Sequence, residues 1–92
     1  MSDLWVVRDA GHDYTALGKF NFLFTRDKYP LGDAAAFQAE LGVLQPDSIL
    51  VPSGPIIFNI AAALYMARLS GHCRVMVFDP RCNTYYEKDL IP

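Results

Sequence analysis

One histidine near the N-terminus is flanked by two carboxylates. His12 lies between Asp9 and Asp13, within residues 8–13. A histidine oriented by a carboxylate can act as a general base near neutral pH, so His12 and Asp9 are the candidate catalytic residues. The same residues also suit a purely structural role, because Gly11 fits a turn and Asp13 can cap a short helical turn. The structural role is the favoured interpretation, since such trios occur by chance in many surface loops.

A second candidate site is Ser53-Gly54, between an apolar strand and a long apolar helix. Free backbone N–H groups at the start of a helix, with a serine hydroxyl beside them, attract an anion such as a phosphate. Asn59, one turn into the helix, could reach the same space. Ser-Gly-Pro also makes a good helix cap without any ligand, and neither G-x-G-x-x-G nor G-x-x-x-x-G-K-[ST] is present. Capping alone is therefore the favoured interpretation, with anion binding as the alternative.

Countercharge to an anion could come from Arg26, Lys28 and Arg81, because each of these residues follows a predicted strand. In an open parallel sheet, ligands bind beyond the carboxyl ends of the strands, where these residues should converge. The candidate ligand-binding residues are Ser53, Gly54, Asn59, Arg26, Lys28 and Arg81.

The cysteines and histidines do not form a metal-binding pattern. Cys73 and Cys82 are expected at opposite ends of one strand, which at about 3.3 Å per residue separates them too far for a disulfide. His12 and His72 are not spaced as ligands of one metal ion. We therefore expect two free thiols in a reducing cytoplasm, and neither a metal nor a cofactor.

The N-terminal half predicts two strands and two helical segments. Residues 4–7 are apolar on both faces, and the aromatic-rich residues 20–25 favour a second strand. Between them, Asp13 can cap a helical turn over residues 14–17 that ends at Gly18. After a polar connection, Asp33 can cap an amphipathic helix over residues 34–41.

The C-terminal half predicts a strand at 48–51, a turn at 52–55, a helix at 56–70 and a strand at 74–78. Ser53 or Gly54 is the expected N-cap, with Pro55 in the first helical turn. A last strand at 84–88 alternates in polarity and should form a hairpin at the sheet edge. Together the elements predict a small α/β domain, residues 1–92, with a Rossmann-like, mostly parallel sheet of four to five strands. Helices should lie on its faces and a β-hairpin at its C-terminal end.

The helix at 56–70 is apolar almost all round between Ile56 and Ala67. Such a helix needs cover on more than one side. The first helical turn and the terminal hairpin could provide it within one chain. The favoured alternative is a homodimer with this helix at or near the two-fold axis, because monomers seldom expose large apolar patches.

Composition limits the classes of function. The net charge of −2 and pI near 5.5 make nucleic-acid binding unlikely. Residues 56–67 fall short of the roughly 20 that span a bilayer, and no signal peptide is evident. We expect a cytoplasmic protein, and we favour a function other than catalysis.

Three functional hypotheses follow. The leading one is a homodimeric binding or regulatory module for a small, phosphate-containing ligand at the carboxyl ends of the strands. The second is a small hydrolase or transferase of phosphate groups, with His12 as the base. The third is a protein–protein interaction domain without a small ligand.

Overall fold

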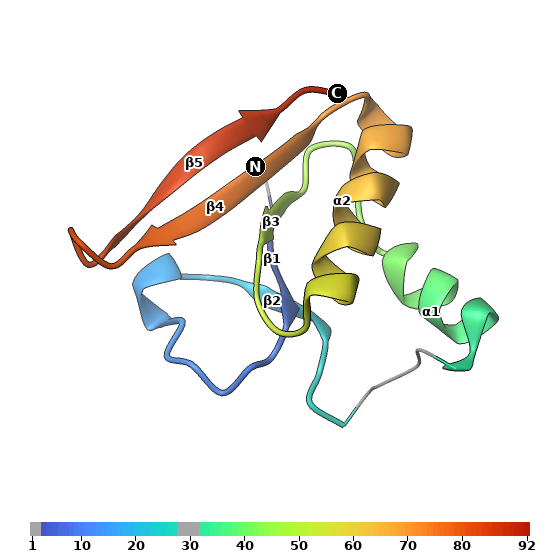
Figure 1. The fold of residues 1–92 in the computed structure, drawn as a ribbon, viewed down its shortest axis with the longest axis horizontal. Helices are drawn as coiled ribbons and strands as arrows, with labels where there is room; N and C mark the ends of the chain where they lie inside the picture. Colours follow the sequence, from blue (N-terminus) through green and yellow to red (C-terminus); the bar gives the residue numbers. More distant parts are fainter. Residues whose placement is uncertain (1–2, 28–31) are drawn as a thin grey trace.

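The computed structural model describes residues 3–27 and 32–92, and five strands in these segments form one mixed sheet. Its spatial order is β2-β1-β3-β4-β5 (Figure 1). The β1–β2, β1–β3 and β3–β4 pairs are parallel, whereas β4 and β5 form an antiparallel hairpin. The strands are β1 (Leu4–Arg8), β2 (Asn21–Phe24), β3 (Ile49–Val51), β4 (Cys73–Asp79) and β5 (Thr84–Leu90).

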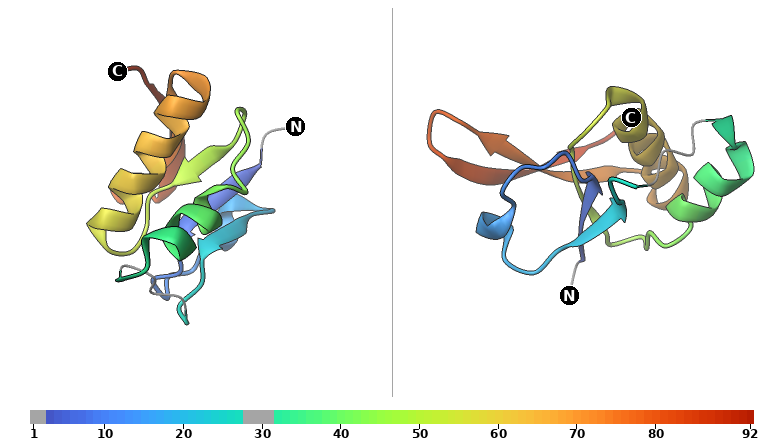
Figure 2. Two further views of the ribbon diagram at one scale, coloured as in Figure 1. Left: turned by 90° about the vertical axis from the view of Figure 1, so that its right-hand side faces the viewer. Right: turned by 90° about the horizontal axis from the view of Figure 1, so that it is seen from below.

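Both α-helices cover the same face of the sheet. They are α1 (Ala34–Leu41) and α2 (Ile56–Ser70), and both lie in front of the strands when viewed from their side (Figure 2, left). This helix face carries the larger core, in which Phe58 and Met66 of α2 pack against the sheet. Its buried members are Val7, Leu23, Phe24, Leu41, Leu44, Leu50, Phe58, Ala62, Met66, Cys73 and Val75.

The opposite face is covered by the segment that connects β1 to β2. This segment contains one short 3-10 helix, η1 (Thr15–Leu17). Because side chains alternate along a strand, Val6, Val51 and Met76 point to this face, opposite to Val7, Leu50 and Val75. Tyr14, Leu17, Phe20 and Phe22 pack on them as an aromatic-rich cluster. We call this the η1 face.

The predicted elements are present, with small shifts at their ends. The Asp33 carboxylate caps α1 by accepting a hydrogen bond from Ala36 N at 3.1 Å, and Gly71 ends α2 in the left-handed conformation. The Asp13 carboxylate accepts from Thr15 N, but the N-cap of η1 is Tyr14 and not the expected Asp13. The C-terminal hairpin is confirmed, and β5 is an edge strand.

Two further structural expectations are wrong, one for the N-cap of α2 and one for the placement of helices on the faces of the sheet. The N-cap of α2 is Pro55, not Ser53 or Gly54, and it makes no side-chain cap hydrogen bond. Helices do not lie on both faces of the sheet: α1 and α2 share one face, and the η1 face has only the 3-10 turn. The connection from β1 to β2 contains two turn-forming glycines, Gly11 and Gly18, both with positive φ, so its helical stretch is short.

The apolar surface of α2 is not covered within the chain. Phe58, Ala62 and Met66 face the sheet, but Ile56 and Leu64 remain 76% and 59% exposed on the outer side. The expected cover cannot form, because η1 lies on the opposite face of the sheet and β5 extends the sheet beyond β4 (Figure 1). The expectation that the first helical turn and the terminal hairpin of the same chain cover α2 is therefore wrong.

None of the helices in the described segments has the length and apolar character that crossing a bilayer demands. The two cysteines are free, with Cys73 buried at the start of β4 and Cys82 exposed in the turn after it.

Candidate functional site

The chain leaves the two central parallel strands in opposite directions. After β1 it moves to β2 at one edge, and after β3 it moves to β4 on the other side. Loops that diverge from adjacent parallel strands leave a crevice beyond the carboxyl ends of those strands, which is where open α/β sheets bind ligands. This crevice is therefore the expected position of a ligand site.

A cavity of about 500 Å³ lies at this crevice. That volume is within the roughly 300–1,000 Å³ range of small-molecule sites. Three segments line it: the β1–β2 connection, the β3–α2 loop and the β4–β5 hairpin. The lining residues are His12, Asp13, Tyr14, Val51, Pro52, Ser53, Gly54, Phe78 and Tyr85. We call this the strand-end cavity.

Two hydroxyls meet at the wall of the strand-end cavity. The Tyr14 hydroxyl lies 2.6 Å from the Ser53 hydroxyl and also accepts a hydrogen bond from Ala10 N at 3.1 Å. Tyr14 is buried at the start of η1, and Ser53 is half-buried after β3. This contact joins the two loops that diverge from the central strands, so it fixes the width of the crevice between them.

Asn59 holds the β3–α2 loop in place. Its amide oxygen accepts from Ser53 N at 2.8 Å, and its amide nitrogen donates to the carbonyls of Ser53 and Pro55, each at 3.0 Å. The side chain thus satisfies backbone groups of the loop that precedes α2. Asn59 does not line the strand-end cavity, and it occupies the Ser53 N–H that the anion hypothesis offered to a ligand.

Gly54 is needed where the loop passes close to β1. Its φ is +81°, and a Cβ at this position would come within 2.9 Å of Arg8 Cβ. The Arg8 guanidinium carbon lies 5.4 Å from the centre of the Phe58 ring, and its Nη2 donates to the Arg26 carbonyl. Arg8 therefore packs between the loops as a structural cation.

The proposed histidine–carboxylate pair is not formed. The Asp9 carboxylate accepts from Gly11 N at 2.9 Å and pairs with Arg26 at 3.4 Å, and these contacts, led by the Gly11 hydrogen bond, lower the pKa of Asp9. Hydrogen bonds from Thr15 lower the pKa of Asp13. In the described part of the chain, His12 has only an edge-on ring contact with Tyr14, at 6.1 Å. His12 lines the cavity without a carboxylate to orient it.

The two described candidate cations are engaged away from the cavity. Arg26 pairs with Asp9 and is largely exposed, whereas Arg81 binds Asp79 through two nitrogens, at 3.1 and 3.0 Å. The Arg81 contacts lower the pKa of Asp79 and raise that of Arg81. Neither arginine lines the strand-end cavity, and Lys28 lies outside the described residues. Of the six predicted ligand-binding residues, the structure places Ser53 and Gly54 at the cavity.

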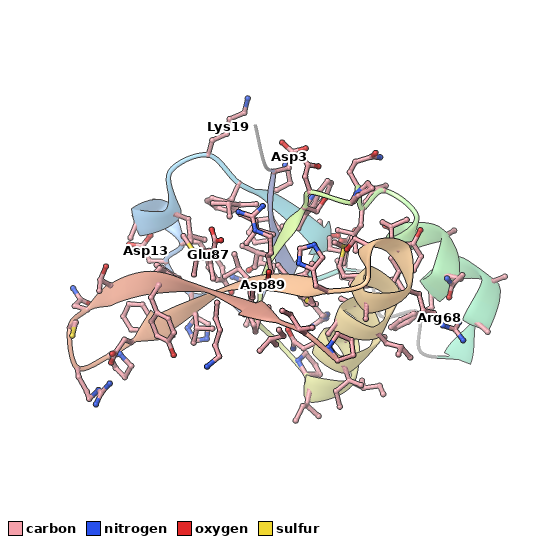
Figure 3. The ribbon with its side chains drawn as sticks, turned by 90° about the horizontal axis from the view of Figure 1, so that it is seen from above. Asp3, Asp13, Lys19, Arg68, Glu87 and Asp89 are labelled. Carbon is pink, nitrogen blue, oxygen red and sulfur yellow. The ribbon has the colours of Figure 1, made fainter. Side chains whose placement is uncertain are left out.

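The aromatic wall of the cavity was not among the predicted site residues. Phe78 and Tyr85 form a directly opposed pair in the β4–β5 hairpin, with ring centres 5.2 Å apart in an edge-to-face arrangement. Burial raises the pKa of Tyr85, so its phenol stays protonated at neutral pH. Asp13 lies beside η1, next to this hairpin, whereas Arg68 lies at the far end of the molecule near α1 (Figure 3). The alternation along 84–88 indicated which face Tyr85 occupies, but not that the face borders a cavity.

No cluster of three or more His, Cys, Asp or Glu side chains suited to a metal ion occurs in residues 3–27 and 32–92. The chain matches no family model, and no curated protein and no solved structure is significantly similar to it. The function of the chain is therefore inferred from the residues of the cavity.

Proposed function

We propose that this chain is a small-molecule-binding module whose site is the strand-end cavity. The observation that carries the proposal is the position of this cavity beyond β1 and β3, with polar and aromatic side chains converging on it from three separate segments. A few polar groups within a mostly apolar concavity are typical of ligand sites. The described carboxylates nearby have lowered pKa values and internal partners, which favours binding over acid–base catalysis.

In this proposal the fold is a small variant of the Rossmann-like architecture. The order β2-β1-β3-β4 with parallel neighbours corresponds to the first four strands of a doubly wound sheet, and β5 replaces the next parallel strand with an antiparallel one. In this proposal the module is cytoplasmic, and its ligand carries a phosphate or another acceptor group directed towards Ser53 and Gly54.

A thermal-shift screen against nucleotides and phosphorylated metabolites tests the binding function. A ligand at 100 times its Kd should raise the free energy of unfolding by about 2.7 kcal/mol. The gain should disappear in Tyr85→Ala, which removes part of the cavity wall, and persist in the matched control Tyr86→Ala, whose side chain lies on the opposite face of the same strand. A screen without any shift would leave the ligand-free interaction domain as the better account.

The second candidate function is phosphate-group hydrolysis or transfer with His12 as general base. The observation that favours it is the place of His12 in the cavity lining. The test is the hydrolysis of p-nitrophenyl phosphate by the wild type and by His12→Ala. Turnover that His12→Ala abolishes without unfolding the chain would select the enzyme, and equal background rates would exclude this role of His12.

We also propose that the functional unit is a homodimer formed through α2. Ile56, Ile60 and Leu64 lie one turn apart in a row, and Ile60 is 55% exposed. The row is symmetric about Ile60, so two antiparallel copies of α2 would place Ile56 of one subunit against Leu64 of the other, as an isologous contact requires. An adjoining apolar groove of about 220 Å³, lined in part by Ala63, Val75 and Leu90, would widen the contact.

A standard interface buries roughly 800 Å² per partner, about one seventh of the 5710 Å² surface of the described chain. We expect the wild type to sediment as a dimer at micromolar concentration and Ile60→Asp as a monomer. Val43→Asp is the matched control, because Val43 is a similarly exposed apolar residue after α1. A wild type that sediments as a monomer at all concentrations would refute the dimer while leaving the cavity untouched.

A further inference from the structure

The surroundings of the two hydroxyls at the cavity wall favour one direction for their hydrogen bond. Tyr14 Oη already accepts the Ala10 N–H, and Tyr14 is only 6% exposed. If Ser53 donated to Tyr14, the phenolic hydrogen would have no protein acceptor in the described structure, which is unfavourable. Either atom of the 2.6 Å contact could be the donor, and these contacts favour donation from Tyr14 to Ser53.

This direction leaves one hydrogen-bond donor available to a ligand. A serine hydroxyl has one hydrogen and two lone pairs, and Tyr14 occupies one lone pair of Ser53. The Ser53 hydrogen is thus free to point into the cavity that this residue lines. A donor in this position pairs with an acceptor oxygen of a ligand, and the second lone pair of the Ser53 hydroxyl is left to accept.

The rest of the wall suits a flat ring. Phe78 and Tyr85 present an edge-to-face pair on one side, and apolar surface is added by Val51 at the end of β3 and by Pro52 in the loop after it. Aromatic rings prefer such offset and edge contacts. Because Arg26 and Arg81 are paired outside the cavity, charge attraction contributes less here than ring contact and one directed hydrogen bond.

We propose that the strand-end cavity binds a ring compound that carries an acceptor oxygen, with the ring against Phe78 and Tyr85 and the oxygen on the Ser53 hydroxyl. Tyr14 is a positioning residue, since it acts by orienting Ser53. This inference rests on the proposed binding function and narrows its ligand class. A carbonyl or a phosphate attached to the ring could provide the acceptor, and the probes below distinguish the two.

The test is NMR titration of the ¹⁵N-labelled chain with four fragments: benzamide, phenyl phosphate, toluene and inorganic phosphate. The two rings with acceptor oxygens should produce saturable shifts at the amides of Val51, Ser53 and Gly54. Toluene, an uncharged ring without an acceptor, should bind roughly 3- to 10-fold more weakly, and inorganic phosphate should not shift these amides. Tighter binding of phenyl phosphate than of benzamide would identify a phosphorylated ligand, and the reverse a neutral carbonyl.

Variants locate the donor. Ser53→Ala should weaken benzamide binding roughly 3- to 10-fold and leave toluene binding unchanged, whereas Ser70→Ala, at the far end of α2, should change neither. Tyr14→Phe should weaken benzamide binding less than Ser53→Ala, because the donor is kept but no longer oriented. Tyr65→Phe removes a phenol from the helix face and should have no effect.

The outcomes separate this inference from the proposed function. Rings that bind equally well with and without an acceptor, unaffected by Ser53→Ala, would overturn the inference and keep the binding module. Shifts with inorganic phosphate alone would overturn the requirement for a ring. The absence of saturable shifts with any probe would overturn both. If Ser53→Ala fails to fold, the wild-type preference for benzamide over toluene decides the question alone.

Discussion

The two faces of the sheet are built differently. The helix face buries eleven residues in one continuous core beneath α1 and α2. The η1 face buries three, and it is covered by a connection with a single 3-10 turn, an aromatic cluster and several side-chain-to-backbone hydrogen bonds. The thinner cover leaves the strand-end cavity open at its border. Stability is thus concentrated on one face and the candidate site on the other.

The largest expected effect tests where the stability resides. Phe58 is fully buried on the helix face and contacts the Phe24 and Phe37 rings. Phe58→Ala should lower the free energy of unfolding by about 3–5 kcal/mol, measured by urea denaturation. Phe20→Ala, in the half-buried cluster of the η1 face, should cost about half as much. Equal losses would show that the two faces contribute alike.

An intermediate effect is expected at the β3–α2 loop, which connects the central strand to the helix face. Asn59→Ala leaves the amide of Ser53 and the carbonyl of Pro55 without their partner, so the free energy of unfolding should fall by about 1–3 kcal/mol. Asn59→Asp keeps the acceptor and loses the donor, so it should fall between the wild type and Asn59→Ala. A loss with Asn59→Asp as large as with Asn59→Ala would place the stabilisation in the donated bonds alone.

The smallest effect concerns pH, and it should act on the η1 face first. The Thr15 hydrogen bonds lower the pKa of Asp13 in the folded chain below the ordinary value of 3.8. The stabilisation is therefore complete above pH 3.8 and is lost as the pH falls through the lower, folded-state pKa. Asp13→Asn should destabilise the chain at pH 6 and be nearly neutral at pH 2.

Amide hydrogen exchange locates this effect. At pH 6, Asp13→Asn should speed exchange at Thr15, whose amide donates to Asp13, and leave the core of α2 around Met66 unchanged. Faster exchange at Met66 would mean that the two faces unfold together.

Much of the fold was accessible from local patterns. The apolar runs at 4–7 and 48–51, the cap at Asp33 and the stop at Gly71 depend on neighbours in the chain, so the sequence predicts them directly. The N-cap of α2 was mispredicted because the Ser53-Gly54 backbone stays outside the helix, where Asn59, one turn later, binds the Ser53 and Pro55 carbonyls. A prediction of the N-cap from the residue types before the helix does not take such a contact into account.

The candidate site was accessible only in part. Ser53 and Gly54 follow a strand, and this indicated a place at its carboxyl end. The two described arginines of the candidate site were expected to converge there. Instead, Arg26 pairs with Asp9 and Arg81 pairs with Asp79. Tyr85 joined the wall through the pairing of β5 with β4, which no periodicity in the sequence specifies.

By itself, the sequence determined the strand–turn–helix–strand order of the C-terminal half and the excess apolar surface of α2, because both follow from residue type and spacing along one segment. Only the tertiary structure decided that α1 and α2 share a face, that the isoleucines of α2 stay uncovered, and that Tyr14 meets Ser53. Those outcomes depend on strand order and on contacts between distant residues, such as Tyr14 and Ser53, which are 39 positions apart. The free energy of such contacts depends on the packing of the whole chain.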